Sequence, residues 1–139
     1  MRKDTPWVWT LECQKAFDTI QNMLSTAPVL AMPDMGPDAP KFYVHCDASI
    51  VGVGAVLIQN DRPVAYESRK LIPAECNYTT GEQALLAVIH AVTVWRCYLE
   101  GVPCVIVTDH NPLVHLQTQP HLSRRQVHWR ELLQSYDFT

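Results

Sequence analysis

The sequence predicts an α/β domain in which helices pack on a mixed β-sheet. Three apolar runs with a period of two follow one another between residues 41 and 68, which is typical of an antiparallel meander. A strong amphipathic helix over 79–99 separates them from a fourth run, 103–109, which is apolar on both faces. Because strand–helix–strand crossovers make their two strands parallel, we expect the fourth strand to run parallel to the first.

The composition places the chain among globular proteins and excludes several other classes. Of its 139 residues, 47% are hydrophobic and 18% are charged, which does not fit a disordered tail. No stretch approaches the ~20 apolar residues of a membrane span, and the N-terminus lacks the apolar core of a signal peptide. Five cysteines without C-x-x-C spacing predict neither a disulfide framework nor a zinc site. We expect an intracellular protein, cytoplasmic or nuclear, that is neither secreted nor bound to a membrane.

The first 40 residues are predicted to form a helix followed by a linker. A helix is predicted over 10–26, where Thr10 can cap the first turn. Its apolar residues recur on one face: Cys13, Ala16, Phe17, Ile20 and Leu24. Residues 31–40 hold three prolines and one glycine, which indicates a linker. The sequence therefore divides into a segment over 1–40 and a domain over 41–139.

The three period-two runs predict strands joined by tight links. The first strand covers Lys41–Asp47 and ends in an acid. The second, Gly52–Gln59, leads into the turn signal Asn60-Asp61. The third, Pro63–Ser68, is expected to close a hairpin with the second.

The second half of the chain predicts helices around one central strand. The helix over 79–99 begins with a capping box, Thr79 to Glu82. Its apolar residues share a face: Leu85, Val88, Ile89, Val92 and Leu99. After the strand over 103–109, a short helix is expected around 112–117 and a last helix over 123–136.

Three acids are expected to meet at one edge of this sheet. Asp47 and Asp109 each end a strand, and the carboxyl ends of parallel neighbours meet at the same edge. Glu82 lies in the first turn of the intervening helix and can reach the same place. Converging carboxylates repel one another, and a divalent cation relieves that repulsion. Hard oxygen ligands favour Mg²⁺ or Mn²⁺ over zinc.

Each acid also has a plainer interpretation, and the residues alone leave both open. Asp47 can be a turn residue at the end of a strand, and Asp109 can cap the short helix after it. Glu82 can be only the reciprocal partner in the capping box. His110, beside Asp109, can assist proton transfer or be a solvated loop residue.

The chain closely resembles the ribonuclease H-like domain of Gypsy-type long-terminal-repeat retrotransposon polyproteins, together with the connection segment that joins that domain to the reverse transcriptase. The matching runs cover nearly the whole chain. They are Trp9–Phe17, Ala27–Leu30 with Pro33-Asp34, Asp47–Ser49 followed by Gly52–Leu57, Pro63–Tyr66, Ser68–Leu71, Asn77-Tyr78, Glu82 ahead of Leu85–Val88, Trp95-Arg96 with Tyr98–Gly101, Thr108–His110, Arg124-Arg125, Trp129 and Tyr136–Phe138.

This resemblance implies a metal-dependent endonuclease that cleaves the RNA strand of RNA–DNA hybrids, with the reverse transcriptase domain preceding it in the same polyprotein. Residues 1–40 then correspond to the connection-type segment. The resemblance makes Asp47, Glu82 and Asp109 ligands of two Mg²⁺ or Mn²⁺ ions, with His110 as an auxiliary residue. The residues expected near the hybrid are Ser49, Arg124, Arg125 and Trp129.

One departure from the family pattern leaves a second interpretation open. Family members continue past Tyr-Asp-Phe with a fifth strand and a fourth acid, whereas this chain stops at Thr139. The alternative is therefore a truncated ribonuclease H-like scaffold, weak or inactive in catalysis, that still binds nucleic acid. A strand-transfer enzyme of the same fold fits less well, because its glutamate lies on a later helix than Glu82.

Overall fold

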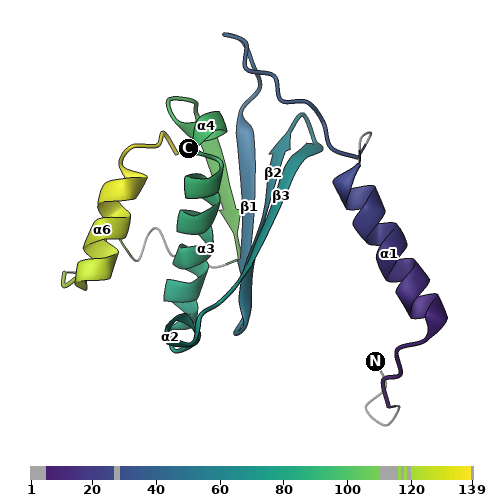
Figure 1. Ribbon diagram of the computed structural model, residues 1–139. Helices are drawn as coiled ribbons and strands as arrows, with labels where there is room; N and C mark the ends of the chain where they lie inside the picture. Colours follow the sequence, from purple (N-terminus) through teal and green to yellow (C-terminus); the bar gives the residue numbers. More distant parts are fainter. Residues whose placement is uncertain (1–5, 27–28, 110–115, 117, 119, 139) are drawn as a thin grey trace.

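The computed structural model describes residues 6–26, 29–109, 116, 118 and 120–138, and it contains a four-stranded mixed sheet (Figure 1). The strands are β1 (Phe42–Ala48), β2 (Gly52–Gln59), β3 (Arg62–Lys70) and β4 (Cys104–Thr108). Their order across the sheet is β3-β2-β1-β4. Neighbouring strands are antiparallel from β1 to β3, whereas β4 runs parallel to β1. The predicted mixed topology is therefore confirmed.

The register of β1 with β4 decides where the site can be built. Phe42 pairs with Cys104, and the pairing continues to Cys46 opposite Thr108. Asp47 and Asp109 are each the next residue after that last pair. The two acids therefore lie at neighbouring strand ends on one edge of the sheet.

The β2–β3 hairpin forms at the predicted turn. Asn60 and Asp61 have φ values of 54° and 55°. A two-residue hairpin turn of type I′ needs positive φ at both positions, and Asn and Asp tolerate this conformation best after glycine. The local sequence therefore fixes the hairpin.

Helices cover one face of the sheet. Helix α3 (Thr80–Val94) packs on β1 and β2, and α6 (Arg124–Leu133) packs against α3 (Figure 1). Two one-turn helices, α2 (Pro73–Cys76) and α4 (Arg96–Leu99), lie at the ends of α3. The single helix predicted over 79–99 is thus broken. The break falls at Trp95, whose φ of −97° and ψ of 23° lie outside the α-helical region.

The core lies between the sheet and α3. Along β1 the side chains alternate, so that Phe42, Val44 and Cys46 are buried whereas the residues between them are exposed. The largest fully buried side chains are Phe42, Val44, Leu57, Val88, Val92, Leu99 and Cys104. All of them belong to the sheet, to α3, or to the short α4 that follows it. The face of the sheet opposite α3 carries the exposed set of β1.

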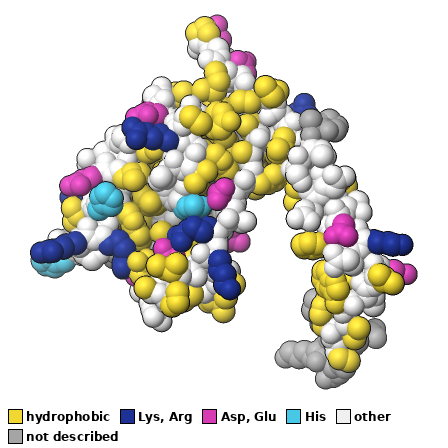
Figure 2. Space-filling model, viewed as in Figure 1, with side chains coloured by type: hydrophobic (Ala, Val, Ile, Leu, Met, Phe, Trp, Pro, Cys, Tyr) yellow, Lys and Arg dark blue, Asp and Glu magenta, His cyan; other side chains and the backbone are white. Residues whose placement is uncertain are grey.

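Helix α1 (Leu11–Ser25) forms as predicted but does not join this core. The Thr10 hydroxyl accepts a hydrogen bond from the Cys13 N–H at 3.2 Å and so caps the first turn. No residue of α1 is buried, and Phe17 remains 52% exposed. The helix stands apart on the other side of the sheet from α3 (Figure 1), with hydrophobic side chains on its surface (Figure 2). Within the described chain, the apolar face of α1 is therefore largely uncovered.

The segment between α1 and β1 is fastened to the sheet by one buried side chain. The Gln59 amide donates to the carbonyls of Asp34 and Pro40 at 2.9 and 2.8 Å. Its carbonyl oxygen accepts from the Asp34 N–H at 2.7 Å. Gln59 is only 3% exposed, so these bonds satisfy a side-chain amide that water does not reach.

We expect Gln59→Leu to destabilise the chain by about 1–3 kcal/mol, because it removes one partner from each of these buried bonds. Denaturant unfolding measures the change. Gln21→Leu, on the exposed surface of α1, is the matched control and should stay within about 0.5 kcal/mol of the wild type. Equal free energies of unfolding for the two variants would show that the hydrogen bonds of the Gln59 side chain contribute nothing to stability.

The outer edge of β4 has a single further partner among the described residues. Phe138 forms a parallel bridge with Cys104, and the Cys104 N–H donates to the Asp137 carbonyl at 3.0 Å. This bridge occupies the position expected for the start of a fifth strand. Except for Leu116, the short helix predicted around 112–117 lies outside the described residues. No helix in the described ranges is long and apolar enough to cross a membrane.

Candidate active site

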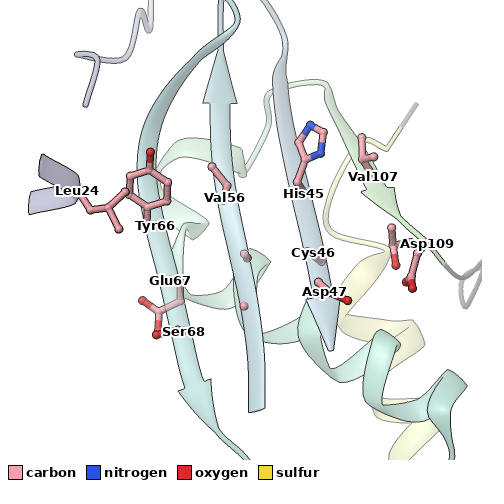
Figure 3. Close-up of a pocket in the computed structure, with 13 residues that line it drawn as sticks. Leu24, His45, Cys46, Asp47, Val56, Tyr66, Glu67, Ser68, Val107 and Asp109 are labelled. Atoms are coloured by element: carbon pink, nitrogen blue, oxygen red, sulfur yellow. The ribbon is translucent and has the colours of Figure 1, made fainter. Parts of the chain in front are cut away.

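The ends of β1 and β4 open into a groove on the face of the sheet opposite α3. The groove has a volume of about 740 Å³ and is lined by residues of all four strands and by Leu24 of α1. Asp47 and Asp109 both line it, and Figure 3 shows them at the same end. Apolar side chains such as Val56 and Val107 form much of the remaining wall. The structure thus brings two of the three predicted acids together.

Both of these acids are accessible. Asp47 is exposed, and one of its carboxylate oxygens accepts from the Ala48 N–H at 2.8 Å. Asp109 is exposed at the residue after β4. Carboxylates at an open groove edge can bind a cation or a solvated substrate without first breaking the core.

Cys46 lies between the exposed residues His45 and Asp47 but offers no ligand to this edge. Its side chain points toward the core, and burial raises the pKa of the thiol to about 12. A thiol with that pKa stays protonated at neutral pH and neither binds metal nor acts as a nucleophile. The oxygen donors of the two aspartates are therefore the relevant groups at this point.

Glu82 is committed to other partners. It is the third residue of α3, where the N–H and the hydroxyl of Thr79 donate to its Oε2 at 3.1 and 3.2 Å. Its Oε1 accepts from Arg125 Nη2 at 2.8 Å. Burial opposes ionisation of this carboxyl, but the hydrogen bonds from Arg125 and Thr79 outweigh it and lower its pKa below the usual value. The carboxylate is therefore ionised and held on both oxygens.

The arrangement fits a divalent cation in part. Asp47 and Asp109 supply the hard oxygen donors that Mg²⁺ and Mn²⁺ prefer. In the part of the chain that the structure describes, no group of three or more His, Cys, Asp or Glu side chains is placed to hold a metal ion. Glu82 does not join the two aspartates in this conformation.

The residues predicted to lie near a nucleic acid fall into different environments. The Ser49 hydroxyl donates to the Gly52 carbonyl at 3.0 Å and accepts from the Gly52 N–H at 3.1 Å, which closes the β1–β2 turn. Trp129 is 6% exposed and belongs to the core. Arg124 is exposed at the start of α6. His110 lies outside the described residues.

Arg125 is held between α6 and α3 on aromatic side chains. Its guanidinium carbon lies 3.7 Å from the centroid of the Tyr78 ring and 5.5 Å from that of Trp129. The hydrogen bond to Glu82 raises the pKa of the guanidinium. No role was predicted for Tyr78 from the sequence. Tyr78 directly precedes the helix cap Thr79, which places it near the start of α3. Only the fold shows that α6 places an arginine above its ring.

The comparisons with known proteins agree with this fold. The family described as "RNase H-like domain found in reverse transcriptase" matches residues 38–136. The chain belongs to this family. The RNase H-like domain is 37% identical over 142 residues to the "Retrovirus-related Pol polyprotein from transposon 412" of Drosophila melanogaster. It is 35% identical over 148 residues to the "Transposon Tf2-3 polyprotein" of Schizosaccharomyces pombe.

Both matches cover 99% of this chain but only 11% of the polyprotein, so the RNase H-like domain corresponds to a small part of these relatives. Among solved structures, the native prototype foamy virus protease-reverse transcriptase aligns with a TM-score of 0.76 at 16% identity. That alignment covers 99% of this chain and 20% of the viral one. A foamy viral protease-reverse transcriptase in complex with double-stranded DNA aligns with a TM-score of 0.73 at 23% identity, over 95% of this chain and 26% of that one. These structures share the fold of the RNase H-like domain.

Proposed function

We propose that this RNase H-like domain hydrolyses the RNA strand of RNA–DNA hybrids with the help of Mg²⁺ or Mn²⁺. The observation that carries the proposal is the pair Asp47 and Asp109, on neighbouring ends of parallel strands at one groove. The family of the chain supports a nuclease role in general. A foamy viral protease-reverse transcriptase of the same fold is known in complex with an RNA/DNA hybrid, which supports the choice of substrate.

In this proposal Asp47 and Asp109 hold the cation directly, and Glu82 is the third ligand. Divalent ions held by these three carboxylates would supply an activated water and would stabilise the leaving oxygen of a phosphodiester. The contribution of the chain is to fix the two aspartates at the edge of a rigid sheet. Their exposure leaves room for a phosphate beside them.

Contacts to the hybrid backbone are proposed for Arg124 and for the turn that Ser49 closes. Arg124 presents its guanidinium to solvent at the start of α6, where it can pair with a phosphate. The turn that Ser49 closes lies directly after the strand that carries Asp47. Recognition of this kind depends on duplex shape and 2′-hydroxyl groups rather than on base sequence.

A reverse transcriptase domain is the proposed partner on the N-terminal side. The chain spans 11% of the polyproteins it matches, so much longer chains surround this domain in its relatives. The uncovered apolar face of α1, which includes Phe17 and Ile20, offers a surface for that preceding part.

The test is cleavage of a hybrid labelled on its RNA strand, in Mg²⁺ or Mn²⁺ and with EDTA as the control. We expect cleavage of the hybrid and none of double-stranded DNA of the same sequence. The alternative, a scaffold that binds nucleic acid without cutting it, is favoured by the commitment of Glu82 to Arg125. Binding of the hybrid by a folded chain without any cleavage would support that alternative.

A further inference from the structure

The ion pair between α3 and α6 engages a carboxylate that the proposed reaction needs. Arg125 reaches from the first turn of α6 to Glu82 in the first turn of α3, with 2.8 Å between Nη2 and Oε1. The Glu82 side chain is 19% exposed and that of Arg125 is 39% exposed. The pair is thus partly shielded from solvent, and it joins the first turns of α3 and α6.

The guanidinium is held by more than this one bond. The guanidinium lies over the ring of Tyr78, and the ring of Trp129 is its second aromatic neighbour. These two cation–π contacts hold the group in place. Tyr78 and Trp129 also contact each other edge to face, with ring centroids 6.3 Å apart. The Arg125 Nε atom is buried and has no hydrogen-bond partner among the described residues. Burying this donor without a hydrogen-bond partner costs desolvation free energy, so the position of Arg125 is maintained at the expense of some stability.

Both oxygens of the Glu82 carboxylate are engaged by other residues of the chain. Oε2 closes the capping box with Thr79, and Oε1 is taken by Arg125. Asp47 and Asp109 are exposed and line the groove. Among the described residues no group of three or more His, Cys, Asp or Glu side chains is placed to hold a metal ion, which is consistent with the engagement of Glu82 by Thr79 and Arg125.

We propose that Arg125 is a built-in counter-ion that holds Glu82 away from Asp47 and Asp109 in the free domain, and that a divalent cation at this edge must compete with Arg125 for the carboxylate. The inference rests on the proposed function, because it assigns the cation to that edge. Arg125 is then a positioning residue, and its effect is on metal affinity before any substrate is bound.

The test is a hybrid-free titration of Mg²⁺ and Mn²⁺ by calorimetry. Arg125→Met keeps the aliphatic stem on Tyr78 but cannot donate to Glu82. We expect it to bind the cation about fivefold more tightly than the wild type, which corresponds to an ion pair of about 1 kcal/mol. Arg124→Met removes the same charge from the neighbouring residue, which is exposed. It should change the affinity for the cation by less than about twofold.

A second pair of variants separates this route from a general effect of charge. In the Glu82→Gln background, adding Arg125→Met should give no further gain in affinity, because the carboxylate for which the cation competes is gone. A gain of the same size with and without Glu82 would overturn the inference. So would an Arg125→Met variant that binds the cation no more tightly than the wild type does.

The wild-type domain offers a readout that needs no variant to fold. The Arg125 Nε–H group should give a distinct NMR resonance, because it is buried and fixed. Saturating Mg²⁺ should shift or broaden it, together with the backbone signals of Asp47 and Asp109. Shifts at the two aspartates without any change at Arg125 would overturn the inference and leave the proposed function standing. Absence of Mg²⁺ binding in both the wild type and Arg125→Met would overturn both.

Discussion

Asp47→Asn is expected to reduce Mg²⁺-dependent hybrid cleavage by at least about 10²–10³-fold, the scale on which loss of one preorganised electrostatic group affects a rate. The substitution keeps the size of the side chain and the oxygen that accepts from the Ala48 N–H. It removes the negative charge that a cation would bind at the edge shared with Asp109. Cleavage of a labelled hybrid under single-turnover conditions measures the loss.

This variant should remain folded, so the loss can be assigned to the site. Asp47 is exposed, and exposed substitutions usually change the free energy of unfolding by less than about 0.5 kcal/mol. Asp61→Asn removes the same charge at the β2–β3 turn, away from the edge that carries Asp47. Asparagine also tolerates the positive φ of this residue. We expect Asp61→Asn to cleave at the wild-type rate. If Asp47→Asn also cleaved at that rate, the proposed role of this strand end would be wrong.

The sequence was sufficient for the sheet because its local patterns and its topology agree. Period-two runs gave the three antiparallel strands, and the crossover rule placed β4 parallel to β1. From these two facts alone it followed that Asp47 and Asp109 lie together at one strand edge. Both aspartates line the groove because the course of the two strands places them there, and the apolar pattern of the sequence predicts those strands.

The environment of Glu82 could not be predicted in the same way. Its helix position was evident from the capping box, but its partner Arg125 is 43 residues away in sequence. Which face of α6 meets α3 depends on side-chain packing around Trp129 and Tyr78. Periodicity predicts that a helix has a buried face, but it does not predict which polar residues meet at its border.

Helix α1 shows the same limit from the opposite direction. The sequence predicted an amphipathic helix here, and the structure leaves Phe17 52% and Leu24 42% exposed on it. An apolar stripe on a helix indicates a surface suited to burial, but the partner that buries it can lie outside the domain. The relatives of this chain are polyproteins about nine times longer than the match, which is consistent with such a partner.

Phe42→Ala is expected to destabilise the domain by about 3–5 kcal/mol, because it removes a fully buried ring and leaves a cavity between the sheet and its helices. Phe42 is the first residue of β1 and pairs with Cys104, so its side chain supports the two strands that carry Asp47 and Asp109. For a domain of this length the loss corresponds to a fall in Tm of about 10–15 °C. Thermal and denaturant unfolding measure it directly.

The adjacent Tyr43 provides the matched control, since it is also aromatic but points to the opposite face of the sheet and is 43% exposed. We expect Tyr43→Ala to cost no more than about 1 kcal/mol, the value of a cross-strand contact. The comparison tests which face of β1 is the core. A Tyr43→Ala variant as unstable as Phe42→Ala would mean that the groove face of the sheet is covered in solution, and the open edge proposed for the cation would then have to be reconsidered.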